Sequence, residues 1–347
     1  MFSSRLSYYL RLAALALAIV LFFRTLFKGH DKAPTLTDEP ISSYKFLEPF
    51  TDGDELLKYR NVYFIESSAP FRNVVTIEPR HACAIEAAAR ANPRKNIIVL
   101  LAAWIDFTEA DRLQIPDLSR LAGFRNVHFR WLDLENFALD TPVDSVIKSD
   151  ELYSLPDGVA FLSEILRMVL LYKYGGIYLD LDVMTLAPLD LYHPNFFSAQ
   201  SMTSADTSVM GLERGDYGQQ FAMEYLEDIK YFHEIGETRN GSTLLTNKLL
   251  QVCEKVTVHE IVENGCFSLL DVHRQHAFHP FDASNINVMF DSALLDEAKQ
   301  MLANSMAVHM LHHHSRTLQS DSNGETGYEM VAKTYCPNVY YANEGEF

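Results

Sequence analysis

Two aspartates separated by a single residue, Asp180 and Asp182, directly follow the short apolar segment from Ile177 to Leu179. In extended backbone, residues i and i+2 share one face, so both carboxylates would point the same way. Carboxylates held this close repel each other unless a cation neutralises them. Oxygen ligands suit Mg²⁺ or Mn²⁺, and such an ion can bridge two phosphates and stabilise a diphosphate leaving group. The spacing therefore predicts a divalent-cation site for a substrate that carries a diphosphate.

The segment before the two aspartates has a pattern that supports this interpretation. An apolar stripe predicts a helix that begins at Asp157 and ends at Gly175-Gly176. The two glycines allow a sharp turn at low steric cost, and residues 177–179 then form a short strand. Ligands bind at the carboxyl ends of strands in open α/β sheets. A lone Asp-x-Asp is common on solvated loops, whereas this helix, turn and strand place the pair where a ligand site is expected.

Two charged residues of this helix, Glu164 and Arg167, lie one turn apart and therefore share a face. One interpretation directs this face at a bound substrate. The alternative is an exposed ion pair on the helix surface, which would contribute only about 0.3–0.5 kcal/mol. Tyr178, in the short strand, is either a core residue or part of the site lining.

A run of three histidines, His312-His313-His314, follows a strand predicted over residues 306–311. If the strand continued, His312 and His314 would share a face and could bind a metal together. The alternative is a solvated loop with no role in binding.

Strand-like and helix-like segments alternate along most of the chain. The β-rich or apolar segments 61–66, 96–101 and 126–132 predict strands, and 81–92, 219–232 and 244–254 predict helices. This alternation predicts an α/β fold with a central, mostly parallel sheet.

The N-terminal region has a different composition from the rest of the chain. An uninterrupted apolar run from Leu12 to Phe23 predicts a membrane anchor, with a cleaved signal peptide as the alternative. We interpret residues 1–28 as a cytoplasmic tail and signal-anchor helix, the polar, proline-containing residues 29–59 as a stem, and residues 60–347 as a lumenal catalytic domain.

Charge and cysteine content narrow the function classes further. The formal net charge of −17 gives no basic groove for nucleic acid. The four cysteines include no Cys-x-x-Cys pair, which argues against a zinc knuckle. They are compatible with two disulfides in a lumenal domain or with four unrelated buried thiols. Cys253 and Cys266, which are near in sequence, are the first candidate pair.

The residues from Ser163 to Asp182, SEILRMVLLYKYGGIYLDLD, resemble the Asp-x-Asp block of the α-1,4-galactosyltransferase and α-1,4-N-acetylglucosaminyltransferase family, which includes lactosylceramide 4-α-galactosyltransferase. Further similar segments extend the resemblance to about residues 61–338. They are Phe64-Ile65-Glu66-Ser67-Ser68, CAIEAAAR at 83–90, GSTLLT at 241–246, Ala307-Val308-His309 and Tyr335-Cys336-Pro337.

The resemblance implies a GT-A type fold, a UDP-sugar donor, Mn²⁺, retention of anomeric configuration, and a single-pass type II topology in the Golgi membrane. It implies catalytic roles for Asp180, Asp182 and Arg167. It implies metal binding by Asp180, Asp182 and His309. Donor binding would involve Glu164, Arg167, Tyr178, Asp180, Asp206 and Gly241. The implied reaction moves galactose, GalNAc or GlcNAc to a glycolipid or glycoprotein glycan.

Several positions depart from the family pattern. Glu164 replaces an Asp, Asp206 stands near an expected Asn, and Ser242 replaces a Pro. The aromatic residues expected after His279-Pro280-Phe281 are missing, and Leu311-His312 replaces Trp-Asn. These changes predict altered specificity, with a catalytically impaired sugar-binding or transferase-partner protein as the alternative. A metal-dependent hydrolase is a third hypothesis, but its usual clusters of further Asp and His motifs are not found. Donor sugar, acceptor and oligomeric state are left open.

Overall fold

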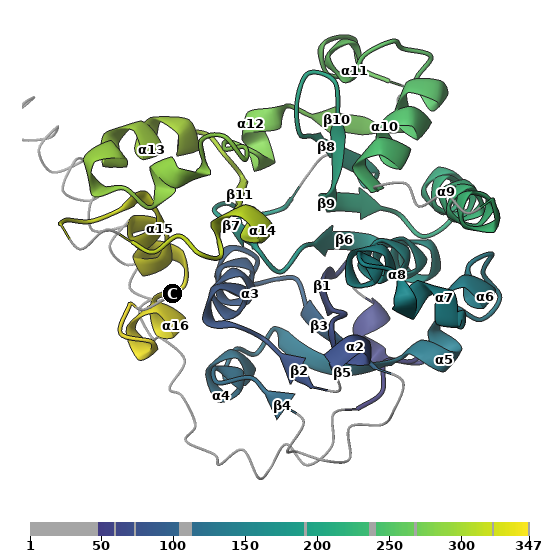
Figure 1. Ribbon diagram of the computed structural model, residues 1–347, viewed down its shortest axis with the longest axis horizontal. Helices are drawn as coiled ribbons and strands as arrows, with labels where there is room; N and C mark the ends of the chain where they lie inside the picture. Colours follow the sequence, from purple (N-terminus) through teal and green to yellow (C-terminus); the bar gives the residue numbers. More distant parts are fainter. Residues whose placement is uncertain are drawn as a thin grey trace, which may run out of the picture. The chain divides into compact units, whose positions relative to one another are not determined.

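A seven-stranded sheet forms the centre of the computed structural model, which describes residues 48–58, 60–72, 74–103, 113–190, 193–235, 241–266, 269–320 and 323–345 (Figure 1). Its strands, from one edge to the other, are β10 (Asp271–His273), β8 (Phe196–Ala199), β9 (Ala205–Leu212), β6 (Gly176–Leu179), β1 (Val62–Glu66), β3 (Ile97–Ala103) and β5 (Val127–Asp133). Strand β9 runs antiparallel to both of its neighbours, and all the other pairings are parallel. The predicted mixed α/β fold with a mainly parallel sheet is therefore confirmed.

Of the strands predicted from sequence in this sheet, β6, β1 and β3 lie in its middle, and β5 forms one edge. All seven residues of β3 are buried, as expected for an apolar strand of a covered parallel sheet. Phe64 of β1 belongs to one hydrophobic core, and its neighbour Ile65 belongs to another. This alternation follows from the two-residue period of a strand. The sheet thus separates two cores, one on each face.

Each core includes a long helix. Helix α3 (Pro79–Ala91) contributes to one core, and helix α8 (Gly158–Tyr174) contributes to the other. Helix α3 begins earlier than predicted because Pro79 suits the first helical turn, where its missing N–H has no intrahelical partner. Helix α8 ends at Gly175, whose φ of 63° is accessible to glycine at little steric cost. The predicted helix and turn before Asp180 are confirmed.

The remaining elements surround the sheet and its two cores. The other helices are α2 (Ala69–Arg72), α4 (Leu118–Ala122), α5 (Leu134–Phe137), α6 (Asp144–Ile147), α7 (Asp150–Ser154), α9 (Asp216–Glu234), α10 (Gly241–Val252), α11 (Val258–Asn264), α12 (Gln275–Phe278), α13 (Leu295–Leu302), α14 (His312–Ser315), α15 (Gly327–Tyr335) and α16 (Pro337–Ala342), with short 3-10 turns at Glu55–Lys58, Ile286–Met289 and Ser292–Leu294. Two small ribbons pair β2 (Val75–Thr76) with β4 (Leu113–Gln114), and β7 (Val183–Thr185) with β11 (Ala307–His309).

The antiparallel ribbon of β7 and β11 connects two segments that carry site residues. In its register, His309 is the partner of Val183, the residue after Asp182. The strand predicted over residues 306–311 is shorter than expected. Leu311 adopts left-handed backbone with φ of 50°, and helix α14 begins at the next residue. The alternative in which His312 and His314 share a strand face is therefore excluded, because the chain turns before it reaches them; the alternative of a loop is replaced by the short helix α14, on which His313 and His314 are exposed.

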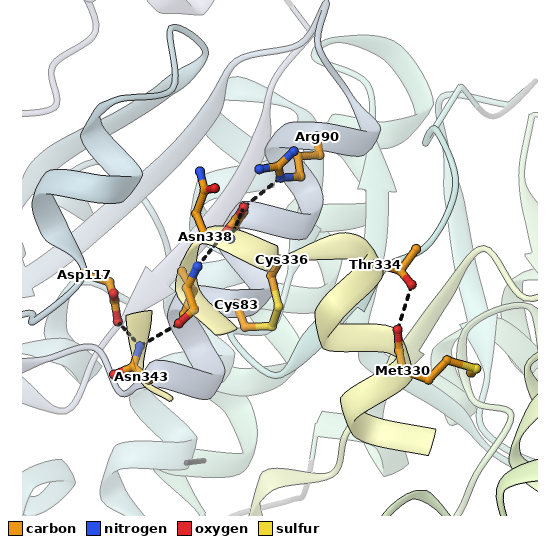
Figure 2. Close-up of a disulfide and its surroundings, with 10 residues drawn as sticks. Cys83, Arg90, Asp117, Met330, Thr334, Cys336, Asn338 and Asn343 are labelled. Atoms are coloured by element: carbon orange, nitrogen blue, oxygen red, sulfur yellow. Dashed lines mark hydrogen bonds and ion pairs between the residues drawn. A yellow bond between two sulfur atoms is a disulfide. The ribbon is translucent and has the colours of Figure 1, made fainter. Parts of the chain in front are cut away.

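Two disulfides are present, so the alternative of four unrelated thiols is wrong. The expected pair Cys253–Cys266 is confirmed. Cys83 of α3 is joined to Cys336, which lies between α15 and α16 (Figure 2). Beside this second disulfide, the buried carboxylate of Glu86 accepts hydrogen bonds from the N–H groups of Asn338 and Val339. The C-terminal helices are thus attached to α3 both covalently and by hydrogen bonds.

The predicted membrane anchor and most of the predicted stem lie outside the described residues. Within the described part of the chain, no helix combines the length and apolarity needed to cross a membrane. The finding does not extend to residues 12–23.

Candidate active site

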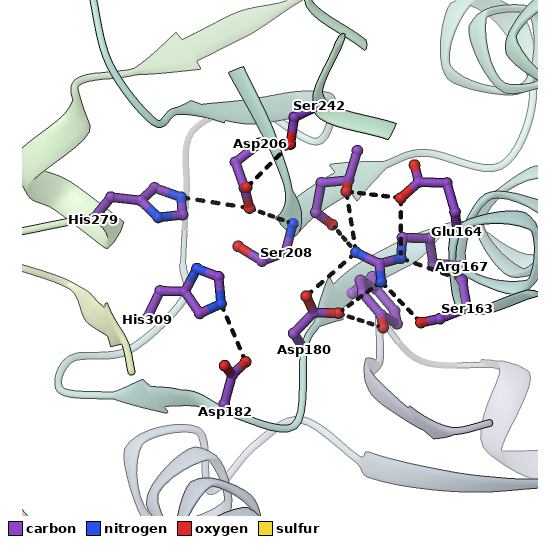
Figure 3. A network of polar contacts seen from close by, with 12 residues as sticks. Ser163, Glu164, Arg167, Asp180, Asp182, Asp206, Ser208, Ser242, His279 and His309 are labelled. Carbon is purple, nitrogen blue, oxygen red and sulfur yellow. Dashed lines mark hydrogen bonds and ion pairs between the residues drawn. The ribbon is translucent and has the colours of Figure 1, made fainter. Parts of the chain in front are cut away.

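Asp180 begins the loop after β6 and is held by Arg167 of α8 (Figure 3). One guanidinium nitrogen lies 3.1 Å from Asp180 Oδ1, and another lies 3.4 Å from Oδ2. The hydroxyl of Tyr178 donates a 2.7 Å hydrogen bond to Oδ1. The Asp180 backbone N–H donates to the carbonyl of Ser208 on β9. Both carboxylate oxygens are therefore oriented by neighbours before any ligand arrives.

Arg167 is itself fixed from several directions. Its guanidinium donates to the Thr207 carbonyl and hydroxyl, both at 3.1 Å, and to the Ser163 hydroxyl at 2.8 Å. It also lies over the Tyr178 ring, 4.8 Å from the centroid. Burial alone would lower the pKa of Arg167, but Asp180, Tyr178 and Glu164 outweigh this effect and raise it. Arg167 is thus a fully charged, buried anchor for Asp180.

Glu164 and Arg167 share a face as predicted, but they do not form the exposed surface pair of the alternative interpretation. Each side chain is buried, and the closest approach of Arg167 Nε to Glu164 Oε2 is 3.9 Å. The Glu164 carboxylate instead accepts a 2.7 Å hydrogen bond from Tyr225 and a 3.0 Å hydrogen bond from Thr207. Glu164 therefore connects α8 to β9 and α9.

Gly241, the first residue of α10, lies directly against this carboxylate. A Cβ atom added there would be 2.0 Å from Glu164 Cδ. The φ of Gly241 is not positive, so its backbone conformation does not itself require glycine. The Gly241 carbonyl also accepts a 3.1 Å hydrogen bond from the Tyr225 hydroxyl. The requirement for glycine thus comes from close packing between α10 and Glu164.

Asp182 faces His309, which the β7–β11 ribbon places opposite it (Figure 3). His309 Nε2 lies 3.2 Å from Asp182 Oδ1, and the backbone N–H of His312 donates a 2.6 Å hydrogen bond to Oδ2. Burial would raise the pKa of Asp182, but His309 and the His312 N–H outweigh burial and lower it. For His309, burial would lower the pKa, but Asp182, Asp206 and Asp180 raise it to about 9. An ion pair therefore joins Asp182 and His309.

Asp180, Asp182 and His309 each offer a ligand atom, and these three atoms lie within 4.8 Å of one another. Two carboxylates and one imidazole form a donor set that suits a divalent ion such as Mn²⁺. In addition, His309 Nδ1 is buried without a hydrogen-bond partner in the described part of the chain. These residues fit the metal that the Asp-x-Asp sequence implies. The ligands come from two segments that are far apart in sequence, one with Asp180 and Asp182 and the other with His309.

Asp206, on β9, lies on the other side of His309. Its carboxylate accepts a 2.7 Å hydrogen bond from the Ser208 N–H and a 3.3 Å hydrogen bond from the Ser242 hydroxyl. Burial would raise the pKa of Asp206, but His279, His309 and Ser208 lower it. Asp206 is therefore a buried anion, and the departure at Ser242 supplies one of its donors.

The sequence indicated His279 only as part of a motif, but the structure brings it into the site. His279 is 1% exposed, and its Nε2 lies 3.8 Å from Asp206 Oδ1 and 3.1 Å from the Ser198 hydroxyl. Its ring centroid is 5.3 Å from that of His309. Burial lowers the pKa of His279 to about 4, against the effect of Asp206, so the ring is neutral at pH 7. No local pattern pairs His279 with Asp206, and only the fold brings the two together.

A cavity of about 500 Å³ opens beside His279. Its lining includes Gln200, Ser204, Gln275, His279, Phe281 and Leu311. Leu311 is a departure from the family pattern, and its neighbour His312 uses its backbone, not its side chain, to hold Asp182. The substitutions in this segment therefore change a cavity wall while the contact to Asp182 is kept.

Two family models match the chain. Residues 78–202 match the glycosyltransferase sugar-binding region containing the DXD motif, and residues 215–343 match the alpha 1,4-glycosyltransferase conserved region. The first model contains Asp180 and Asp182, and the second contains His279 and His309.

Curated relatives align over most of the chain. Lactosylceramide 4-alpha-galactosyltransferase of Rattus norvegicus is 26% identical over 81% of this chain and 75% of its own length. Human alpha-1,4-N-acetylglucosaminyltransferase is 23% identical over 81% of this chain and 80% of its own length. Inositol phosphoceramide mannosyltransferase 3 of Schizosaccharomyces pombe is 45% identical, over 15% of each chain.

Solved structures with a related arrangement include the PaToxG glycosyltransferase, with a TM-score of 0.43 and 16% identity over 56% of this chain and 72% of that chain. The galactosyltransferase LgtC gives a TM-score of 0.31 and 13% identity over 81% of this chain and 99% of that chain. The two matched regions and the aligned relatives show that the chain belongs to the alpha-1,4-glycosyltransferase family, as a divergent glycosyltransferase with a DXD sugar-binding region.

Proposed function

We propose that this glycosyltransferase uses Mn²⁺ and a UDP-sugar donor, and that it transfers the sugar with retention of anomeric configuration. The observation that carries the proposal is the convergence of Asp180, Asp182 and His309 at the end of β6. Arg167 supports it, because it already orients the Asp180 carboxylate, which then needs little rearrangement when a cation and a diphosphate bind.

In the proposed reaction, Asp180, Asp182 and His309 would hold the cation. When bound, the cation would supply positive charge that stabilises the departing UDP. Arg167 keeps Asp180 in place and adds a fixed positive charge beneath it. The bond from the sugar C1 to the diphosphate oxygen breaks, and the acceptor oxygen bonds to C1 on the same face. The acceptor proton passes to the departing phosphate oxygen.

The proposed donors are UDP-galactose, UDP-GalNAc and UDP-GlcNAc, and the proposed acceptors are glycolipid or glycoprotein glycans. The names of the relatives support galactose and GlcNAc as the transferred sugars and a glycolipid, lactosylceramide, as an acceptor. We place the acceptor at the cavity beside His279 and Leu311, because its wall contains positions that depart from the family pattern. A Golgi location with an uncleaved N-terminal anchor and the catalytic domain in the lumen completes the proposal.

The test is a screen of UDP-sugars with the purified full chain and Mn²⁺, in which UDP release is measured. Release with at least one donor, and its loss in EDTA or on Asp182→Ala, is expected. Asp296→Asn is the matched control, because the Asp296 side chain is 90% exposed and pairs with Lys299 at the surface. Full activity in EDTA or in Asp182→Ala would contradict the proposal.

The alternative of a catalytically impaired sugar-binding or transferase-partner protein is not favoured. The curated relatives are transferases, and the residues that orient Asp180 and Asp182 are in place. A direct measurement separates the two: tight UDP binding with Mn²⁺ but no turnover with any donor would revive it.

A further inference from the structure

A second group of possible metal ligands lies beside the Asp182 loop and takes no part in the proposed donor site. Glu78, His81 and His312 each offer a ligand atom, and these atoms lie within 4.8 Å of one another. His312 Nε2 is 3.7 Å from Glu78 Oε2, and the rings of His81 and His312 have centroids 4.8 Å apart. The group thus joins the start of α3 to the start of α14.

Polar atoms of Glu78 and His81 lack the hydrogen bonds that their positions would lead us to expect. Glu78 occupies the position just before α3, yet its carboxylate makes no capping hydrogen bond. The Nδ1 atom of His81 is buried and has no hydrogen-bond partner among the described residues. Buried polar atoms in folded proteins almost always have a partner, and a bound ion can be that partner. The group therefore has the properties expected of a ligand site.

The donor chemistry favours zinc over the hard cations. Two imidazoles and one carboxylate form a three-ligand zinc set that leaves a fourth position for water. Zinc bonds of about 2.0–2.2 Å in tetrahedral geometry place ligand atoms roughly 3.3–3.5 Å apart. The 3.7 Å separation of His312 Nε2 and Glu78 Oε2 is close to this value. Since the Glu78 side chain is 49% exposed, it can move the remaining distance at little cost.

The charges around the group also allow a cation. The positive end of the α3 dipole and the Arg80 guanidinium oppose one. Arg80, however, donates to the carbonyls of Ser315 and Leu318, which directs its charge to a neighbouring turn. The Glu78 carboxylate belongs to the group, and the Asp182 carboxylate accepts the His312 N–H and so lies next to it.

We infer that Glu78, His81 and His312 form a Zn²⁺ site, separate from the proposed donor-metal site, that fastens the start of α3 to the segment after β11. This segment follows His309, and it holds Asp182 through the His312 N–H. Zinc bound here stabilises the arrangement of the donor site without contacting the substrate.

The test uses the full chain, stripped of metal and then dialysed against trace Zn²⁺ with excess Mn²⁺. One Zn²⁺ per chain is expected, together with a rise in Tm, because an ion that binds only the folded state stabilises it. His312→Gln and Glu78→Gln should each raise the Zn²⁺ dissociation constant by at least ~10-fold. His313→Gln and His314→Gln should leave it unchanged, since these neighbouring side chains are exposed and outside the group.

A second variant separates this site from the donor site. Asp180→Asn removes a proposed donor-metal ligand and should retain the zinc. Zinc lost in Asp180→Asn but retained in His312→Gln would overturn the inference, because the ion would then occupy the donor site. No zinc binding at all would also overturn it, while leaving Mn²⁺-dependent UDP release to be judged separately. Since His81 is largely buried, His312→Gln, whose side chain is 27% exposed, is the primary variant.

Discussion

Arg167 Nη2 lies 3.1 Å from Asp180 Oδ1, inside a shell formed by Ser163, Thr207 and Tyr178. The Arg167 side chain is buried and the Asp180 side chain is 24% exposed, so water can replace only part of the contacts that either residue would lose without the other. The ion pair between Arg167 and Asp180 therefore affects both the stability of the fold and the proposed metal site.

Replacement of Arg167 is expected to be costly in both respects. Arg167→Ala leaves the partly buried Asp180 carboxylate with the Tyr178 hydroxyl but without its cation, which should lower the free energy of unfolding by about 1–3 kcal/mol. Arg167→Lys keeps the charge but cannot reach both Asp180 oxygens and Thr207 together, so Mn²⁺-dependent UDP release should fall by about tenfold or more. Urea unfolding and UDP release measure the two effects. Wild-type values for Arg167→Ala would show that the pair contributes little.

Gly241→Ala tests the close packing of α10 on Glu164. The added Cβ would lie 2.0 Å from Glu164 Cδ, so we expect destabilisation of about 1–3 kcal/mol from overpacking. Gly53→Ala is the control, because its Cβ would meet only one atom, at 4.0 Å. Glu164→Asp withdraws the carboxyl by one methylene and should restore part of the loss in the double variant. A Tm for Gly241→Ala equal to that of the control would refute the packing argument.

Mn²⁺ binding should release a proton from His309. Its pKa of about 9 means that the metal-free ring is protonated at pH 7, whereas a ligating imidazole must be neutral. The apparent affinity should therefore rise by up to about tenfold per pH unit between pH 7 and pH 9 and then level off. Calorimetry in buffers of different ionisation enthalpy counts the protons. If His309→Gln releases as many as the wild type, His309 is not the source.

The same shift predicts the stability of the metal-free chain at alkaline pH. Because the folded pKa of His309 is about 9 and lies above the unfolded value of about 6.5, its contribution is fully present below pH 6.5. It is lost as the pH rises through 9 and amounts to roughly 3 kcal/mol in all. Urea unfolding between pH 6 and pH 10 should show a decline that is absent in His309→Gln. An identical decline in both would assign it to other groups.

The two disulfides should differ in their effect on stability. Cys83–Cys336 spans 253 residues, and Cys253–Cys266 spans 13. The chain-entropy treatment of loop closure makes the longer link more stabilising by roughly 2–3 kcal/mol. The double variants Cys83→Ala/Cys336→Ala and Cys253→Ala/Cys266→Ala, compared by urea unfolding, should show this order. The reverse order would mean that the denatured chain retains structure around α3.

Local features of this protein were predictable from its sequence because they depend on neighbouring residues. The apolar stripe of α8, the glycine turn and the short strand before Asp180 follow from side-chain period and backbone freedom over about twenty residues. The inner strands β1 and β3 and the edge strand β5 were similarly recognisable as apolar or β-rich segments. The Cys253–Cys266 pair was found because its two ends are near in sequence.

Features that depend on distant segments were decided by the tertiary structure. Pairing of β7 with β11 brings His309 to Asp182, and β9 brings Asp206 to His279, over separations that no local pattern encodes. His312 shows the difference most directly. The sequence ended the strand at Leu311 and left His312 either on a continued strand or in a solvated loop. Left-handed backbone at Leu311 instead turns the chain and directs the His312 amide to Asp182 and its ring to His81. Residue types and spacing thus indicated the chemistry of the site, and long-range packing determined which side chains come together there.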